Sequence, residues 1–336
     1  MKKMNFAILG TGNIAAQMAD TVSRMNNVVL YACASRTQEK SEDFANRFGV
    51  LNAYGSYASM LEDDNIDLVY VATPHSLHYE HTLLCLNKGK AVLCEKPFAL
   101  NYIQAKEMID TAREKKLLLA EAMWMRYQPM AKKICDLVDS GIIGTPRLLL
   151  ANKGELDLNG FAPELAGSTL LGLGVYAIND AFLVFGNNYE DVTSTAIFEE
   201  NGLDGANSII LKYANGKMAM LSSSMIAPTS NKWYISGDDG MLEIQGLSRL
   251  KTVRHYNRKR ELVQEFNAEG LDTGYEYEVQ ACMEALESGA IECPQMPHEE
   301  TIAVMKLMDR LRDDWGLKLV GAVSYTHLRA HETGAY

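Results

Sequence analysis

Short apolar runs alternate with amphipathic stretches over about the first 120 residues of the chain. The runs are rich in β-branched residues and predict strands at residues 6–9, 28–34, 68–72, 91–94 and 117–120. The stretches between them have a helical period and predict helices at residues 14–25, 38–48, 56–62, 78–87 and 102–115. Because such an alternation is typical of βαβ units, this part of the chain is expected to form one doubly wound parallel sheet.

The pattern changes after the Gly144-Thr145-Pro146 turn, where the alternating runs become longer. They predict strands at residues 147–152, 191–198, 207–213, 217–224, 232–236, 241–245 and 251–256, with helices at 168–185, 275–288 and 298–315. Asn215-Gly216 and Asp239-Gly240 separate consecutive runs, as in β-hairpins. We therefore expect an α/β protein with one domain over residues 1–122 and a second, α+β domain over residues 123–319. The second domain should contain a large, mostly antiparallel open sheet.

The final segment, residues 320–336, shows no apolar periodicity. It resembles translated vector or adapter sequence, so we expect it to be a non-native tail. His327 and His331 have the i, i+4 spacing of helical metal ligands, but they lie in this tail and are not counted as a metal pair.

Composition narrows the range of partners and locations. The chain has 32 basic and 43 acidic residues, a formal net charge of -11, which argues against nucleic acid and anionic membranes as partners. No segment approaches the roughly 20 apolar residues of a membrane span, and no signal peptide is apparent, so we expect a cytoplasmic protein. The six cysteines form no C-x-x-C pair and are expected to be reduced. They are Cys33, Cys85, Cys94, Cys135, Cys282 and Cys293.

The first predicted strand runs into G-T-G-N-I-A at residues 10–15, a turn that opens the first helix. Gly10 permits a tight turn, Gly12 lets the backbone approach a pyrophosphate, and the small Ala15 lets the helix pack on the strand. This context favours a dinucleotide-binding (Rossmann) domain, and the alternative is a purely structural glycine turn. The expected cofactor contacts here are Gly10, Thr11, Gly12, Asn13 and Ile14.

The end of the second predicted strand bears on the choice between NADP and NAD. An NAD enzyme usually has an acidic residue there, which bonds the ribose 2′-hydroxyl. This chain has Ser35, Arg36 and Thr37 instead, and these side chains are able to bind a 2′-phosphate. NADP is therefore favoured, although NAD remains possible. The alternative interpretation is that Arg36 is a solvated loop residue.

Two further strand ends carry candidate chemistry, because ligands bind at the carboxyl ends of parallel strands. Lys96 follows the strand at 91–94, where burial and a cationic nicotinamide would lower its pKa; it is either a catalytic group or a surface lysine. The histidines after the strand at 68–72 are either nicotinamide contacts or helix caps. The further expected cofactor contacts are Thr73, Pro74, His75, His78, Glu95 and Lys96.

Three motifs together resemble the glucose-fructose oxidoreductase, inositol dehydrogenase and rhizopine-catabolism (Gfo/Idh/MocA) family. They are G-T-G-N-I-A, A-T-P-x-x-x-H-x-E at residues 72–80 and E-K-P at residues 95–97. The segment at residues 121–129 is similar to the E-A-x-W-x-R-[FY]-x-P segment of the dihydrodiol dehydrogenase and NADP-dependent xylose dehydrogenase branch. This resemblance implies NADP, oxidation of a vicinal diol or an aldose C1 hydroxyl, and a homodimer packed through the open sheet.

The resemblance also indicates where the second domain contributes to catalysis. The family places a His or Tyr after a D-x-G motif on the first long helix, and Tyr176 matches this position. Its phenol would exchange the substrate's hydroxyl proton beside Lys96; the alternative is a core tyrosine. Gly172 replaces the family's usual Asp, which puts the substrate class or full activity in doubt. The expected substrate contacts are Trp124, Arg126, Tyr176, Asn179 and Asp180, of which the last two are otherwise a polar helix face.

The sequence therefore favours an NADP-dependent oxidoreductase acting on a sugar, cyclitol or cyclic trans-diol. Tyr176 or Lys96 would take the hydroxyl proton, and no cluster has metal-ligand spacing, so no metal is expected. One alternative is a reductase of anhydro or keto sugars from the same family. The other is a non-catalytic NADP-binding sensor, which Gly172 supports and the retained Lys96 and Tyr176 oppose.

Overall fold

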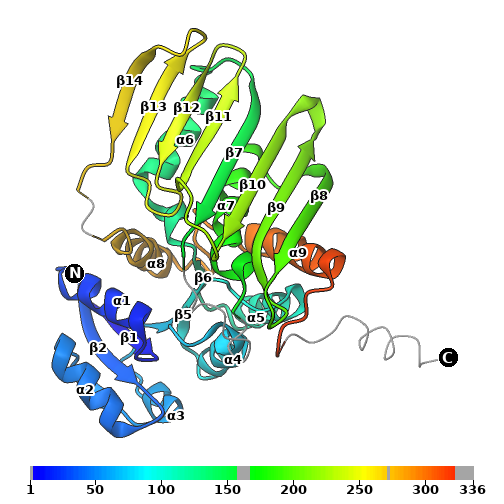
Figure 1. The fold of residues 1–336 in the computed structure, drawn as a ribbon. Helices are drawn as coiled ribbons and strands as arrows, with labels where there is room; N and C mark the ends of the chain where they lie inside the picture. The colour runs from blue at the N-terminus through cyan, green and yellow to red at the C-terminus, as the bar shows by residue number, and fades with distance from the viewer. Residues whose placement is uncertain (1–2, 157–166, 271–272, 322–336) are drawn as a thin grey trace.

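The computed structural model describes residues 3–156, 167–270 and 273–321, which build two sheets with helices around them (Figure 1). The N-terminal sheet has six parallel strands in the order β3-β2-β1-β4-β5-β6. These strands are β1 (Met4–Leu9), β2 (Val28–Ala34), β3 (Asn52–Tyr54), β4 (Leu68–Val71), β5 (Ala91–Glu95) and β6 (Leu119–Ala122). The order reverses direction at β1, so the predicted doubly wound sheet is confirmed.

Helices connect these strands and cover the two faces of the sheet. They are α1 (Asn13–Ser23), α2 (Gln38–Phe48), α3 (Tyr57–Leu61), α4 (His78–Asn87) and α5 (Tyr102–Lys115). Because right-handed crossovers leave β1 in one direction and β4 in the other, α1 and α2 lie on the face opposite α4 and α5. Thr37 and Asn101 cap α2 and α5 through their side chains.

Two details of this domain differ from the sequence-based expectation. The strand expected at 117–120 is β6 at Leu119–Ala122, so Glu121 lies inside a strand. β3 was not expected, because its three residues are too few to show an alternating pattern.

The C-terminal sheet has eight strands in the order β14-β13-β12-β11-β7-β10-β9-β8. β7 pairs with β10 in parallel and the other neighbouring strands are antiparallel, which confirms the mostly antiparallel open sheet. The strands are β7 (Pro146–Gly154), β8 (Tyr189–Phe198), β9 (Asp204–Tyr213), β10 (Met218–Ser224), β11 (Lys232–Gly237), β12 (Gly240–Gln245), β13 (Thr252–Asn257) and β14 (Leu262–Asn267). β14 was not expected; it is an edge strand with mostly exposed side chains, so apolar alternation is absent.

Helices α6 (Pro129–Asp139), α7 (Val175–Phe185) and α9 (His298–Trp315) lie on one face of this sheet (Figure 1). A π-helical turn, Leu170–Gly174, precedes α7, so the expected helix at 168–185 consists of two parts. α6 was not expected, although Pro129 at its first turn is a typical helix start.

A late part of the chain, residues 291–315, returns to the N-terminal domain. After α8 (Glu276–Ser288), the Ile291 carbonyl accepts a hydrogen bond of 3.0 Å from the backbone N–H of Leu119 in β6. In α9, the Thr301 hydroxyl donates to a Glu121 carboxylate oxygen at 2.7 Å. α9 also packs against α5. The last two helices therefore cover the β6 side of the N-terminal sheet.

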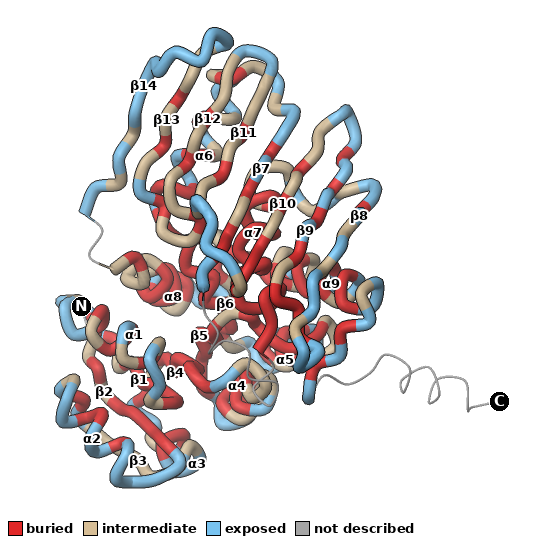
Figure 2. The backbone as a smooth tube through the Cα atoms, in the orientation of Figure 1, coloured by how far each residue is buried: buried red, intermediate tan, exposed pale blue. Residues whose placement is uncertain are grey.

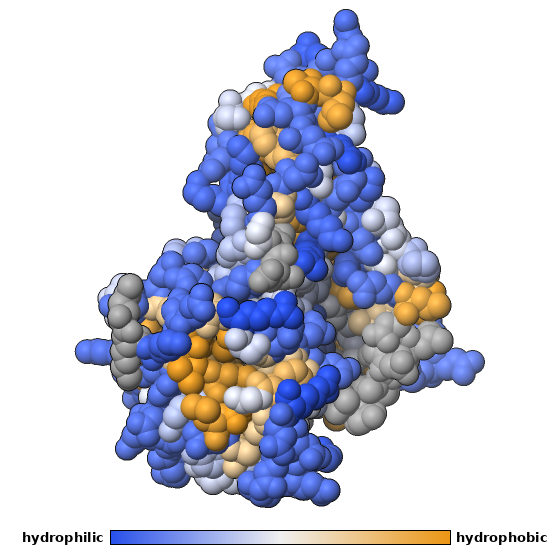
Figure 3. All heavy atoms as spheres, turned by 90° about the vertical axis from the view of Figure 1, so that its left-hand side faces the viewer, coloured by the Kyte–Doolittle hydropathy of each residue, from blue (hydrophilic) through white to orange (hydrophobic). Residues whose placement is uncertain are grey.

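Burial follows the layers of the fold, since β4 and β5 are buried along their whole length (Figure 2). The sheet face opposite α7 is more open: Leu148, Leu150 and Ile210 are each 39% exposed there. The face shown in Figure 3 is mostly hydrophilic, with an apolar area on its lower part, over the N-terminal domain. None of the described helices is both long enough and apolar enough to cross a bilayer. Most of the expected tail lies outside the described residues.

Candidate active site

The glycine turn after β1 has the geometry that its sequence requires. Gly10 has φ +110°, and a Cβ atom there would lie 2.7 Å from the Ala72 carbonyl oxygen at the end of β4. Gly10 therefore combines a left-handed backbone with a close backbone approach, both of which need glycine. Thr11 turns towards β2, with its hydroxyl 3.4 Å from that of Ser35.

The start of α1 fits the pyrophosphate of a dinucleotide. Gly12 occupies the N-cap position and has no side chain with which to cap the helix, whose first turn contains no acidic residue. A Cβ atom at Gly12 would meet no protein atom within 4 Å. The N–H groups of the first turn, which begins at Asn13 and Ile14, are thus available to an anion.

The loop after β2 presents one cation. Ser35 is buried, and its backbone N–H donates to the Tyr54 carbonyl at 3.2 Å. Arg36 is exposed, so its guanidinium is accessible beside the turn. The Thr37 hydroxyl accepts from the Lys40 backbone N–H at 3.4 Å and caps α2, which leaves its proton available for a second partner.

His78 joins the ends of β4 and β5. Its ring nitrogens lie 2.8 Å from the carbonyl oxygens of Thr73 and Pro97, and the side chain is fully buried. Burial lowers the pKa of His78 to about 4, so the ring is neutral at pH 7. Both nitrogens face protein carbonyls, so the structure gives His78 a bracing position in place of the expected cofactor contact.

The neighbouring residues of this strand end remain closer to the surface. Pro74 is exposed, and His75 is partly buried with its ring centroid 5.7 Å from that of His78. Burial lowers the pKa of His75, and the nearby His78 and Lys96 lower it further. The Thr73 hydroxyl lies 3.0 Å from Nδ1 of His81. Of these residues, Pro74 and His75 have the most accessible side chains.

Lys96 and Tyr176 come together from the two domains. Lys96 follows β5, and its Nζ lies 4.7 Å from the ring centroid of Tyr176 on α7. Its ammonium donates to the Gly172 carbonyl at 3.2 Å. Burial lowers the pKa of Lys96, which Glu95 and Glu155 oppose by their charge. The predicted pair is therefore adjacent, but the ammonium faces the ring and a carbonyl.

The Glu95 carboxylate forms its hydrogen bonds with groups other than the Lys96 ammonium and the Tyr176 hydroxyl. It accepts hydrogen bonds from the Tyr70 hydroxyl and, at 3.0 Å, from the Lys96 backbone N–H. Burial raises the pKa of its carboxyl group. The Lys96-Pro97 peptide bond is cis. Glu95 thus holds the backbone from which the Lys96 side chain projects.

The Tyr176 hydroxyl has an indole as its partner. Trp124 Nε1 donates to it at 3.0 Å, and both side chains are at least nine-tenths buried. Burial raises the pKa of Tyr176, and the Trp124 hydrogen bond opposes that rise. Sequence reasoning placed Trp124 in the pocket wall, but it contained no signal for this bond.

A buried acid that sequence reasoning missed anchors the start of the π-helical turn. Asp204, the first residue of β9, accepts from the Ser168 hydroxyl at 2.6 Å, the Leu170 backbone N–H at 2.8 Å and the Asn207 amide at 3.0 Å. Three donors on one carboxylate fix the backbone that leads into α7, and so the position of Tyr176. A D-G-A-N sequence carries no general signal for this role.

Gly172 faces a methionine. A Cβ atom at Gly172 would lie 2.5 Å from Cε of Met225, the flexible end of that side chain. An aspartate at this position would therefore require Met225 to move. The departure from the family pattern is thus accompanied by a side chain that fills the space.

Of the remaining expected substrate contacts, the side chains of Arg126 and Asn179 form hydrogen bonds within the protein, and that of Asp180 forms none with the described residues. Arg126 donates to the Gln295 carbonyl at 3.2 Å and to the Asn179 carbonyl at 3.4 Å, and it pairs with Glu300. The Asn179 amide donates to the Val175 carbonyl at 2.9 Å. Asp180 is fully buried, and its oxygens have no hydrogen-bond partner among the described residues. Burial raises the pKa of the Asp180 carboxyl group.

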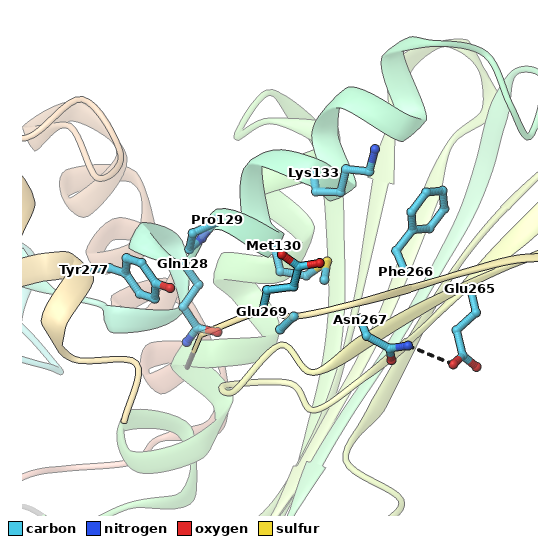
Figure 4. A pocket seen from close by; sticks show the side chains of 10 residues that line it. Gln128, Pro129, Met130, Lys133, Glu265, Phe266, Asn267, Glu269 and Tyr277 are labelled. Carbon is cyan, nitrogen blue, oxygen red and sulfur yellow. Dashed lines mark hydrogen bonds between the residues drawn. The ribbon is translucent and has the colours of Figure 1, made fainter. Parts of the chain in front are cut away.

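A cavity of about 430 Å³ lies apart from Lys96 and Tyr176 (Figure 4). It is lined by Gln128, Pro129, Met130, Lys133, Glu265, Phe266, Asn267, Ala268, Glu269 and Tyr277. The Gln128 amide already bonds the Ser248 carbonyl and the Leu250 N–H, both at 2.9 Å. Among the described residues, no group of three His, Cys, Asp or Glu side chains is placed to hold a metal ion.

Comparisons with known proteins match both domains. Residues 4–123 match "Oxidoreductase family, NAD-binding Rossmann fold", and residues 131–243 match "GFO/IDH/MocA C-terminal domain". The chain is 32% identical to trans-1,2-dihydrobenzene-1,2-diol dehydrogenase of Xenopus laevis, over 93% of this chain and 98% of the relative. It is 30% identical to scyllo-inositol 2-dehydrogenase (NADP(+)) of Bacillus subtilis, over 94% and 98%.

A solved structure shows the same architecture. It is a 3-ketoreductase from Actinomadura kijaniata in complex with NADP and TDP-benzene, with a TM-score of 0.84 and 27% identity. The similarity covers 93% of this chain and 98% of that one. The predicted family is confirmed: the chain belongs to the Gfo/Idh/MocA oxidoreductases, with an NAD-binding Rossmann domain and the family's C-terminal domain.

Proposed function

We propose that this protein is an NADP-dependent dehydrogenase that acts on a carbinol carbon of a sugar, cyclitol or cyclic trans-diol. The single observation that supports this most is the meeting of Lys96 and Tyr176, with Nζ 4.7 Å from the ring centroid, across the two domains. A proton carrier beside a cation, at the sheet edge that also carries the dinucleotide turn, suits alcohol oxidation. The relatives named above are dehydrogenases of a diol and an inositol.

The two residues divide the handling of the proton. When bound, the nicotinamide accepts the electron pair of the substrate's carbinol C–H bond as a hydride. Tyr176 acts as a phenolate, whose negative charge the Lys96 ammonium stabilises before transfer. The phenolate oxygen takes the substrate's hydroxyl proton as the carbonyl bond forms, and Tyr176 becomes a neutral phenol. The reverse sequence reduces a carbonyl. Trp124 is proposed to face the substrate with its indole. Arg126, Asn179 and Asp180 are proposed to support this substrate site.

The direct test is NADP+ reduction followed at 340 nm, with protein that ends at Leu319. The panel contains aldoses, inositols and cyclic trans-diols, and NAD+ is run in parallel. We expect turnover of at least one of these substrates with NADP+. NADP binding without turnover in either direction would instead favour the sensor, with Gly172→Asp as the first reversion.

A reductase of keto sugars is the second candidate, because the solved relative is a 3-ketoreductase in complex with NADP. The same chemistry run in reverse would serve it, so the substrate is what distinguishes the two. NADPH oxidation with keto and anhydro sugars should be faster than oxidation of the corresponding alcohols if this candidate is correct.

We also propose that Arg36 selects NADP by binding its 2′-phosphate. Its guanidinium is exposed at the end of β2, and a relative carries NADP(+) in its name. Arg36→Ala should weaken NADP binding by about 1–3 kcal/mol, roughly 5- to 150-fold, because a charge-assisted bond is lost. Titration of both cofactors by fluorescence checks this, and an equal loss for NAD and NADP would contradict the role.

A homodimer through the open sheet is a further proposal. Leu148 and Leu150 on β7 and Ile210 on β9, each 39% exposed, support it, because water-exposed leucines on central strands favour a covering partner. Light scattering should give twice the chain mass, and Leu150→Asp should reduce it to the chain mass. A monomeric wild type would refute this.

We also propose the cytoplasm as the location of the protein, which the free cysteines support.

A further inference from the structure

The hydrogen-bond partner of the Tyr176 hydroxyl is Trp124, whereas the proposed chemistry would first suggest Lys96. An indole nitrogen only donates, so the Tyr176 oxygen accepts the 3.0 Å bond from Trp124 Nε1. The Lys96 ammonium lies over the ring and donates to a carbonyl of the π-helical turn. Of the described side chains, the indole is therefore the one that contacts the oxygen where negative charge would develop.

Two consecutive residues, Gly274 and Tyr275, pack against the indole. Trp124 stacks on Tyr275, with ring centroids 4.6 Å apart and an interplanar angle of 25°. Gly274 lies against the indole: its φ is +102°, and a Cβ atom there would be 2.8 Å from Cζ3 of Trp124. Only 9% of Trp124 is exposed. The N–H direction is thus set by its neighbours as well as by Tyr176.

Tyr275 continues the contacts to the helix behind the glycine turn. Its hydroxyl donates to Oε1 of Gln17 on α1 at 3.2 Å. Nearby, the Thr21 and Thr273 hydroxyls form a 2.8 Å bond between the same two segments. A continuous line of contacts therefore runs from α1 through Tyr275 and Trp124 to the Tyr176 oxygen.

We propose that Trp124 and Tyr275 are positioning residues for Tyr176: the indole N–H stabilises the phenolate, and Tyr275 holds the indole against α1. This rests on the proposed function, because a phenolate at Tyr176 matters only if that residue carries the proton. Trp124 acts through the tyrosine oxygen, and Tyr275 acts through Trp124. The pair ties the proton carrier to the helix that follows the cofactor turn.

The sign of the expected pH effect follows from the surroundings of Tyr176. The charged and titratable groups that face it are Lys96, Glu95, Glu155, Tyr275 and Glu278. Burial and the three carboxylates raise the pKa of Tyr176, and the indole bond lowers it. Without the indole N–H the pKa rises, so the deprotonated form needed for alcohol oxidation is reached only at higher pH.

The test compares Trp124→Phe and Tyr275→Leu with Trp315→Phe as a matched control. Trp315 donates its own N–H to Ser194 at 2.9 Å, far from the site. Trp124→Phe should move the acid limb of kcat for alcohol oxidation up by about one pH unit, a tenfold loss below the limb. The Kd for NADP+ should change less than twofold. Tyr275→Leu should shift the limb in the same direction, and Trp315→Phe should not shift it.

If the acid limb of the kcat profile does not shift in Trp124→Phe, the proposal is overturned. Turnover by the wild type would in that case still support the proposed function. A second readout needs no turnover at all. Tryptophan emission should change in Tyr176→Phe and in Tyr275→Leu, and neither change should occur in a Trp124→Phe background. Unchanged tryptophan emission in both variants would show that Trp124 does not make these contacts and would overturn the proposal. Emission changes without any turnover would count against the proposed function alone.

Discussion

Lys96→Ala is expected to lower kcat by about 10²- to 10⁴-fold while the Kd for NADP changes less than tenfold. The reason is the position of Nζ, 4.7 Å from the ring centroid of Tyr176, from which, in the proposed mechanism, its charge stabilises the proton carrier. Lys96 is partly buried, so water and salt screen its charge less than that of a surface lysine. Stopped-flow and steady-state assays at 340 nm give kcat, and fluorescence titration gives the Kd.

Lys88→Ala is the control for this experiment. It removes the same charge from an exposed lysine of the same domain, which pairs with Glu62 at 2.5 Å. Its kcat should remain within about twofold of the wild type, since surface pairs contribute little. Normal turnover in Lys96→Ala would show that Lys96 has no catalytic role. An equal loss of kcat in Lys88→Ala would indicate a general effect of the lost charge.

Gly10→Ala and Gly12→Ala should separate stability from cofactor binding. At Gly10 the φ is +110° and an added Cβ atom would lie 2.7 Å from the Ala72 carbonyl oxygen. Together these predict a loss of about 2–4 kcal/mol in the free energy of unfolding. At Gly12 a Cβ atom meets no protein atom within 4 Å, so the free energy of unfolding should fall by less than about 1 kcal/mol.

NADP affinity, in contrast to stability, should be strongly reduced by Gly12→Ala. Its Cβ would project at the start of α1, where a pyrophosphate is expected, and overpacking there should weaken NADP binding about 10- to 100-fold. Urea unfolding and NADP titration of each variant measure both quantities. Full affinity in Gly12→Ala would show that the pyrophosphate lies elsewhere, and unchanged stability in Gly10→Ala would show that the turn relaxes without loss.

The sequence was sufficient to predict five of the six strands of the N-terminal sheet, because apolar runs alternate there with amphipathic stretches. The candidate residues after β4 and β5 also lie together, as expected because parallel strands end at one edge of a sheet. Short or exposed elements were missed. β3 has three residues and β14 shows no apolar alternation, so neither differs from a loop in its local pattern.

The contacts of the site residues could not be predicted, because their partners are distant in sequence. Trp124 and Tyr176 are 52 residues apart, and Tyr275 and Gln17 are 258 apart. A motif indicates that an indole or a guanidinium is near the site, but it does not say which atom that group bonds. Arg126 shows the difference: its partners Gln295 and Glu300 belong to the last part of the chain.

The return of the last two helices to the first domain has a consequence for biosynthesis. Residues 291, 298 and 301 bond Leu119 and Glu121, so the N-terminal domain has contacts that span about half the chain. A ribosome must synthesise the chain as far as residue 301 before all of these contacts can form, and such long-range contacts slow folding. The emerging N-terminal domain therefore exposes the β6 side of its sheet until that segment has been made, and a chaperone that shields this edge during that time should raise the yield of active protein.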